Sequence, residues 1–168
     1  LNSAREHKPG ASQQLAALIN DVIKPEIVRA TALAELQQYL DQTNIESLRM
    51  ALSDRSELVR TAALRGLENA PASIKVQLTV PLLSDPILGV RIEAARILAP
   101  YPPGDLPPEL GAALNKASKE YVDSQLANAE APQAQTNLGL FYGAQGKFIE
   151  AEKAFRAAIE AENQFIPA

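Results

Sequence analysis

Apolar residues in the first hundred positions recur at intervals of three and four, which is the spacing of one face of a helix. These apolar segments come in pairs, and short polar turns separate the two members of each pair, at Asn20-Asp21, Ser53-Asp54 and Ser84-Asp85-Pro86. Each unit is therefore predicted to be a helix, a tight turn and a second helix. The turn in the first unit is two residues longer than the others.

The second segment of each pair carries the same signature. It reads VRATALAEL from Val28, VRTAALRGL from Val59 and VRIEAARIL from Val90, so the copies begin 31 residues apart. A fixed period of this length is typical of repeat proteins, in which each helix pair buries its apolar face against the next pair. We therefore predict an all-α fold, an α-solenoid of helix-turn-helix repeats.

Small and charged residues inside the signature have distinct predicted roles. Close approach of packed helices is expected at the small positions Ala32, Ala63 and Ala94. The arginines of the signature lie along one edge of the predicted stack: Arg29, Arg60 and Arg91. Ion pairs with Asp54 and Asp85 in the turns would form a ladder that also satisfies backbone groups at helix ends. A binding role for the arginines is the alternative, but their spacing follows the fold and favours the ladder.

Prolines interrupt the helical pattern at two places. The proline-rich segment 101–108 predicts an extended connector, and helix is expected to resume at Glu109 and to run to about Asn128. Pro81 lies inside the predicted first helix of the third copy. Because proline removes a backbone donor and clashes with the preceding turn, it should bend or end that helix.

A different helix pair follows the connector. Its signature residues are Leu138, Gly139, Tyr142, Gly146, Ala151, Phe155 and Ala158. The small residues Gly139 and Ala151 predict a close crossing of two helices, with Tyr142 and Phe155 filling the gaps on either side. Gly146 is expected to end the first helix in the left-handed conformation. The two helices are predicted over about 132–145 and 148–161.

Both patterns resemble known repeat families. The 31-residue signature is similar to the short bacterial class of HEAT repeat, and the later pattern resembles one tetratricopeptide repeat, whose motif is W-x-x-L-G-x-x-Y…A-x-x-x-F…P. Gln135 replaces the tryptophan of that motif and Asn163 replaces its proline. The resemblance implies HEAT-like repeats over 1–100 (about 12–40, 43–70 and 72–100), a connector over 101–108, and 109–168 with a long helix, one tetratricopeptide repeat (about 132–165) and the start of another. We therefore expect the chain to be a piece of a longer protein.

The tetratricopeptide resemblance also implies a binding surface. In that family the first helix of each pair lines a groove for partners, and the motif would place there Gln133, Thr136, Asn137, Leu140 and Gly143. Asn137 stands where the family often uses an asparagine to hydrogen-bond a peptide backbone. The alternative is that Asn137 is only a polar residue of an exposed helix face.

Composition and charge argue against a catalytic, metal-binding or nucleic-acid-binding function. The net charge of −4 is spread evenly over 168 residues without a basic stripe, which argues against nucleic acid as a partner. The chain has no cysteine and one histidine, His7, and no catalytic or metal-binding constellation is evident. Its apolar runs are shorter than the ~18 residues that a membrane span needs. We predict a chain that is not an enzyme, holds no metal or cofactor, does not insert into membranes, and binds a protein or peptide.

The order of the segments carries a further resemblance. HEAT-like repeats, a proline-rich connector, a long helix and a tetratricopeptide repeat resemble the C-terminal region of proteobacterial periplasmic multihaem c-type cytochromes. This implies a periplasmic scaffold in an electron-transfer context, which docks a partner or positions a haem domain. Haem c would belong only to a part of the parent outside this sequence. The alternatives are a cytoplasmic peptide-binding adaptor of co-chaperone type and an accessory subunit resembling a tetrapyrrole lyase.

Overall fold

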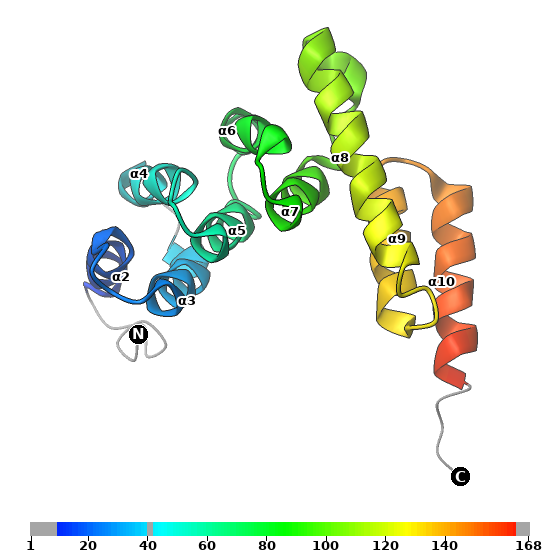
Figure 1. Ribbon diagram of the computed structural model, residues 1–168, viewed down its shortest axis with the longest axis horizontal. Helices are drawn as coiled ribbons and strands as arrows, with labels where there is room; N and C mark the ends of the chain where they lie inside the picture. The colour runs from blue at the N-terminus through cyan, green and yellow to red at the C-terminus, as the bar shows by residue number, and fades with distance from the viewer. Residues whose placement is uncertain (1–9, 40–41, 164–168) are drawn as a thin grey trace. The chain divides into compact units, whose positions relative to one another are not determined.

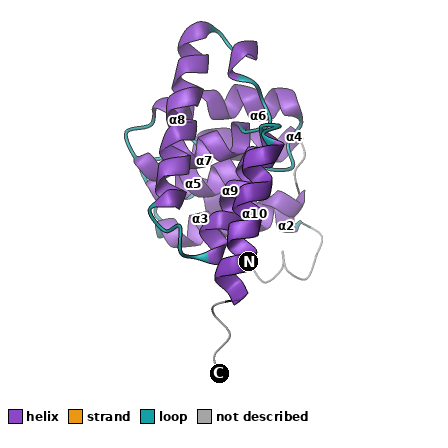
Figure 2. Ribbon diagram, turned by 90° about the vertical axis from the view of Figure 1, so that its right-hand side faces the viewer, coloured by secondary structure: helices purple, strands orange, loops and turns teal. Residues whose placement is uncertain are grey.

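The computed structural model describes residues 10–39 and 42–163. Throughout these residues the regular structure is helical, and Figures 1 and 2 show helices joined by loops. The predicted all-α class is therefore confirmed for this part of the chain. Contacts within the chain divide it into two compact units, Leu1–Ile97 and Leu98–Ala168.

Helices of the first unit follow one another in pairs along the chain (Figure 1). The pairs are α2 (Ala11–Asn20) with α3 (Glu26–Leu36), α4 (Gln42–Ala51) with α5 (Glu57–Gly66), and α6 (Ala72–Thr79) with α7 (Leu88–Leu98), and the short 3-10 helix η1 (Gln37–Tyr39) follows α3. Helix α2 packs against α3 and α4, and α5 packs against α3 and α4. Each of the first two pairs therefore covers the apolar side of the other.

Residues of the repeated signature form the core of this unit. The small positions Ala32, Ala63 and Ala94 are fully buried, as are Leu36 and Leu67, and Leu98, at which the second unit begins, is fully buried too. Burial of a leucine side chain contributes about 1.5–3 kcal/mol, so the repeated leucines are a large part of the stabilising area. Val59 and Val90 are buried as well, whereas Val28 in the first copy is half-buried.

Pro81 ends the α-helical part of the third copy, as predicted. Helix α6 stops at Thr79, and the chain continues as the 3-10 helix η2 (Val80–Ser84). Pro81 lies near the start of η2, where its missing N–H costs no helical hydrogen bond. The tighter helix still buries Leu82 and Leu83, so the apolar face of the copy is kept.

The second unit starts with the proline-rich segment. It contains the 3-10 helix η3 (Pro103–Asp105), α8 (Pro108–Leu126), α9 (Pro132–Ala144) and α10 (Phe148–Asn163). Prolines begin α8 and α9, where a fixed φ favours the first helical turn. Helix α9 packs against α10 and, more lightly, against α8. The predicted end of the long helix at about Asn128 lies two residues beyond the observed end of α8.

Two glycines of the later signature have the predicted roles. An added Cβ at Gly139 would come within 2.5 Å of the Phe155 ring, so glycine permits the close crossing of α9 and α10. Gly146 has a φ of 73° and ends α9 in the left-handed conformation. Ala151 and Ala158 are buried on α10. Phe155 covers Gly139 from the rim of the helix pair and keeps 37% of its surface exposed.

Candidate interaction surfaces

An aspartate in each inter-helix turn organises the start of the following segment. The Oδ1 atoms of Asp21, Asp54 and Asp85 accept hydrogen bonds from the backbone N–H two residues further on, at 3.1, 2.9 and 2.9 Å. These contacts are the local turn that a short carboxylate side chain favours. The same device therefore recurs in all three copies, although the first turn is longer.

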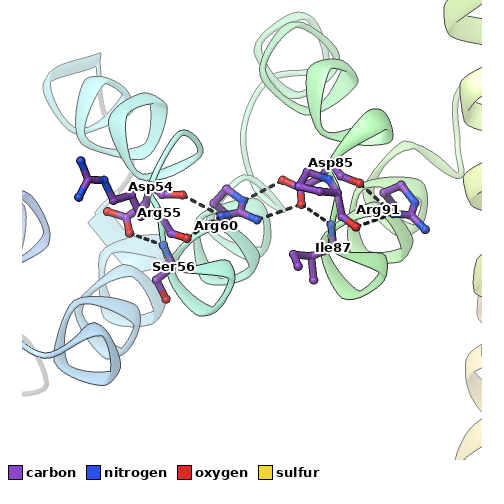
Figure 3. A network of polar contacts seen from close by, with 8 residues as sticks. Asp54, Arg55, Ser56, Arg60, Asp85, Ile87 and Arg91 are labelled. Atoms are coloured by element: carbon purple, nitrogen blue, oxygen red, sulfur yellow. Dashed lines mark hydrogen bonds and ion pairs between the residues drawn. The ribbon is translucent and has the colours of Figure 1, made fainter.

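The signature arginines pair with the turn aspartates of the next copy. Arg29 forms an ion pair with Asp54. Arg60 binds both carboxylate oxygens of Asp85, with its Nε and Nη2 atoms at 2.8 and 2.9 Å (Figure 3). The Arg60 and Asp85 side chains are only 11% and 8% exposed. Ion pairs between the signature arginines and the turn aspartates are therefore present as predicted. The two described pairs, however, join an arginine to the turn of the following copy and not to the turn before its own helix.

Backbone carbonyls complete the surroundings of two of the arginines. Arg60 Nη1 donates to the carbonyl oxygens of Asp54 and Arg55, at 2.8 and 3.1 Å. Arg91 Nη1 does the same with Asp85 and Pro86, at 2.8 and 3.2 Å (Figure 3). Arg60 and Arg91 thus each stabilise the turn before their own helix, and Arg60 also binds the turn of the next copy.

Arg29 differs from its counterparts. Its side chain is buried, but no acceptor among the described residues reaches its Nε atom. The turn before Arg29 is the longer one, and Val22, Ile23 and Lys24 in it are exposed. The difference lies in how the carboxylate is bound: Arg29 reaches Asp54 with Nη2, whereas Arg60 uses both Nε and Nη2 for Asp85.

A second polar network joins α5 and α7, and the sequence analysis did not identify it. Glu93 is buried on α7 and accepts from Arg96 Nη2 at 2.8 Å and from Arg65 Nε at 3.3 Å. Arg96 also binds Glu68 at 3.0 Å. Burial alone would lower the pKa of Arg96, but its hydrogen bonds and charge attraction to Glu93 and Glu68 outweigh burial and raise this pKa above its ordinary value.

The signature arginines and aspartates are thus occupied by contacts inside the chain. Arg60 and Asp85 form two hydrogen bonds with each other, and little of either side chain is exposed to a partner. These contacts favour the structural interpretation of the arginines over a binding role. Candidate interaction surfaces therefore have to be sought among the exposed residues.

Helix α9 carries the residues predicted to face a groove. Gln133 donates from Nε2 to Asn137 Oδ1 at 3.2 Å, and Asn137 Nδ2 donates to Gln125 Oε1 of α8 at 3.0 Å. The chain of amides fixes the orientation of Asn137, which is half-buried. Its amide therefore lies at the edge between α8 and the exposed side of α9.

The other predicted groove residues differ in their surroundings. Leu140 is 61% exposed, one turn beyond Thr136, whose hydroxyl donates to the carbonyl of Pro132 at 3.0 Å. Gly143 is half-buried, and an added Cβ there would lie 4.0 Å from the Cβ of Ala151 on α10. Leu140 thus belongs to the outer face of α9 together with Gln133, whereas Gly143 turns towards α10.

Exposed apolar side chains continue onto α8 and α10. The large ones in this unit, besides Leu140, are Leu126, Phe148, Ile149, Phe155 and Ile159. On α10 the residues at 148, 155 and 159 are separated by seven and four positions, which is helical spacing for one face. That spacing was visible in the sequence, but it was not interpreted as a surface.

Among the described residues, no group of three or more His, Cys, Asp or Glu side chains comes together in a way that could hold a metal ion. Among the same residues, no helix combines the length and the apolar character that crossing a bilayer requires.

Comparisons with known proteins do not assign the chain to a family. No protein-family model, no curated protein and no solved structure matches it.

Proposed function

We propose that this chain is a non-catalytic helical-repeat scaffold that binds a protein or peptide partner. In this proposal the three copies form a HEAT-like α-solenoid, and α9 and α10 form a tetratricopeptide repeat with α8 before them. Support comes from the Asp–Arg rungs, which link each signature copy to the next at the same positions. The close crossing at Gly139 and the left-handed Gly146 support the second repeat type.

The observation that carries the proposal is a strip on the outer side of α9, which we call the α9 strip and define as Gln133, Asn137 and Leu140. Its apolar member is 61% exposed, and its amides are oriented by hydrogen bonds to one another and to Gln125. An exposed apolar side chain beside fixed polar groups suits a protein surface, which offers both apolar contacts and backbone hydrogen bonds.

The cellular context of the proposal rests on resemblance. We propose that the parent is a periplasmic multihaem c-type cytochrome, in which this region docks a partner or positions the haem domain. The supporting residues are those of the repeat signatures and their order along the chain. Haem would be held entirely outside the present sequence.

Site-specific crosslinking tests the scaffold function. Benzoylphenylalanine at Leu140 should crosslink one protein in cells of the source organism, since a partner on the α9 strip covers this position. The matched control places the same residue at Lys153, which is exposed on α10. If both positions give the same crosslinks, or if neither gives any, the α9 strip is not a binding surface.

Affinity for the crosslinked partner then tests the individual contacts. Asn137→Ala should weaken binding by about tenfold, the effect of losing one well-placed hydrogen bond and part of its support. Lys153→Ala should leave the affinity unchanged. Thermal unfolding of both variants should match that of the wild type within a few degrees, because neither side chain is fully buried. Unchanged affinity in Asn137→Ala would remove Asn137 from the proposed site.

A further inference from the structure

A hollow in the second unit has the size and lining of a small-ligand site. Its volume is about 510 Å³, within the ~300–1,000 Å³ typical of ligand pockets. The connector forms one wall with Pro100 to Pro103, Leu114 on α8 lies in another, and Phe141 on α9 in a third. None of the residues of the α9 strip lines it. We call this hollow the connector pocket.

Close packing holds the connector wall in place. An added Cβ at Gly111 would lie 2.5 Å from the carbonyl oxygen of Pro103, so the connector rests directly on the α8 backbone. The Tyr101 N–H donates to the carbonyl of Leu98 at 2.9 Å, which fixes the start of the same wall. The pocket is thus bounded by packed elements and does not require a loop to close.

The end of α9 positions two polar residues of the lining. Lys147 N–H donates to the carbonyl of Tyr142 at 2.9 Å, and Gly146 N–H donates to that of Gly143 at 3.0 Å. With the left-handed Gly146 between the helices, these bonds form a Schellman motif. The motif fixes the backbone of Gln145 and Lys147, and both residues line the pocket.

The charge of the lining is one-sided. Lys119 and Lys147 line the pocket, and no aspartate or glutamate among the described residues does, although the whole chain has a net charge of −4. The Lys147 ammonium lies 6.0 Å from the centre of the Tyr142 ring, which also lines the pocket. Lys119 is already paired with Asp123 at 2.6 Å. Lys147 is therefore the cation best placed to meet an anionic group.

A second polar group of the lining is left without a partner. The Oε1 atom of Gln145 is buried, and no donor among the described residues reaches it. A buried acceptor without a hydrogen bond costs about 1–3 kcal/mol. Because this atom has almost no accessible surface, the Gln145 side chain has to rotate to present it to a ligand N–H, and the new hydrogen bond then removes a penalty already present. The unsatisfied group lies in the same short turn as Lys147.

We propose that the connector pocket binds an apolar amino-acid residue with an acylated amino group and a free carboxylate. The carboxylate would pair with Lys147, the amide N–H would donate to Gln145 Oε1, and the side chain would fill the space between the proline wall and Phe141. Two sources share this chemistry: the C-terminal residue of a peptide and a free N-acylated amino acid. The proposal is independent of the α9 strip, because the two sites share no residue.

Calorimetry on the full chain tests the ligand chemistry with four probes. The peptide acetyl-Ala-Ala-Ala-Phe with a free carboxylate should bind saturably, and its C-terminal amide should bind about tenfold more weakly or worse. Phenylpropanoate, which has the ring and the carboxylate but no N–H, should bind more weakly than N-acetyl-phenylalanine. Absence of binding by every carboxylate at millimolar concentration, or equal binding of the acid and the amide, overturns the proposal.

The same measurements separate the two sources. If N-acetyl-phenylalanine binds as tightly as the peptide acid, the site is built for a free acylated amino acid. If the peptide acid binds at least about tenfold more tightly, equivalent to about 1.4 kcal/mol, residues before the C-terminus contribute and a peptide end is the ligand. Either result supports the shared chemistry.

Variants of the lining residues show which side chains bind the ligand, and their melting temperatures show whether a lost affinity comes from unfolding. Lys147→Ala should lower the affinity for the peptide acid at least about tenfold but leave the affinity for the peptide amide unchanged, since only the acid carries the charge. Gln145→Leu removes the unsatisfied acceptor, so its melting temperature should equal or exceed that of the wild type while its affinity falls. Lys153→Ala, which removes an exposed lysine outside the pocket, is the matched control and should change neither value. If Lys147→Ala and Gln145→Leu both bind the peptide acid with wild-type affinity, the proposed site is wrong.

Two of the four tyrosines, Tyr101 and Tyr142, line the pocket and provide a local readout. Binding should change the NMR signals of their rings and of the Gln145 side-chain amide. Tyr39, which lies in the other unit, provides an internal reference and should not respond. Changes confined to Tyr39 and its unit would place the ligand elsewhere and overturn the assignment.

Discussion

Arg60 and Arg29 occupy the same position of the repeat, but their guanidinium groups have different surroundings. Arg60 uses Nε and Nη2 for the carboxylate of Asp85 and Nη1 for two carbonyls. Arg29 pairs with Asp54, and its buried Nε atom meets no acceptor in the part of the chain that the structure describes. Since a planar fork is needed only where several acceptors are arranged around it, arginine is harder to replace at position 60 than at position 29.

Lysine substitution measures this difference directly. Arg60→Lys should lower the free energy of unfolding by about 2 kcal/mol, because lysine cannot bind both carboxylate oxygens and the carbonyls together. Arg29→Lys should cost clearly less, since it also removes the unsatisfied Nε. Urea unfolding followed by circular dichroism gives both values, and the two variants serve as controls for each other. Equal losses of unfolding free energy in the two variants would show that the contact of Arg60 Nε with Asp85 does not contribute to stability.

Residue types at these positions could be predicted, but their partners could not. The sequence placed Asp54 and Asp85 in turns and the arginines on a common edge, which led to the ladder. It did not show that Arg29 and Arg60 reach forward to the next copy, because that depends on the offset between packed layers. The Glu93–Arg96 network was missed for a related reason: Arg65 and Arg96 occupy the same position of the repeat, but Glu68 and Glu93 have no acidic counterpart 31 residues away.

Helix boundaries in this chain follow proline and glycine closely. Helix α6 ends before Pro81, α8 and α9 begin at prolines, and α9 ends at Ala144, two residues before the left-handed Gly146. These are local effects of backbone geometry, and the sequence is sufficient to predict them. The packing of the connector on α8 is not local. It depends on the absence of a side chain at Gly111, where no repeat motif draws attention to a glycine.

Alanine at two helical glycines tests the importance of that close approach. Gly111→Ala should destabilise the chain by about 1–3 kcal/mol, because the new Cβ would meet the Pro103 carbonyl and neither backbone can move freely. Gly89→Ala in α7 is the matched control. Nothing lies within 4 Å of its Cβ position, so it should be neutral or stabilising by up to about 1 kcal/mol. Thermal melting of the two variants should shift in opposite directions or by clearly different amounts.

The same element explains why the connector pocket was not predicted. Proline-rich segments between helical repeats indicate an extended linker, and the sequence analysis described residues 101–108 only in that way. The structure buries Leu98 and Ala99 and packs the following prolines near α8, which creates a wall. The sequence analysis assigned no role to Gln145 or Lys147. Their role in the lining depends on the three-dimensional position of the α9–α10 turn.

At the scale of the whole molecule, the chain consists of two compact units with different repeat signatures. In repeat proteins each layer is stabilised mainly by its immediate neighbours, so damage in one layer spreads first to adjacent layers. Ala63 is fully buried in α5, in the middle copy of the first unit. A disruptive change there should therefore act on residues up to 97 and leave the second unit folded.

Ala63→Glu provides this test, because it places an unpaired carboxylate between closely packed helices. The first unit should lose about 3 kcal/mol or more of stability, or unfold. Hydrogen exchange read by mass spectrometry should then show lost amide protection in residues 10–39 and 42–97, with protection retained in 98–163. Ala34→Glu makes the same change at an exposed site of α3 and should leave both units protected. Loss of protection across both units would mean that the chain folds as one cooperative block, and unchanged protection in the first unit would mean that the alignment of the three copies is wrong.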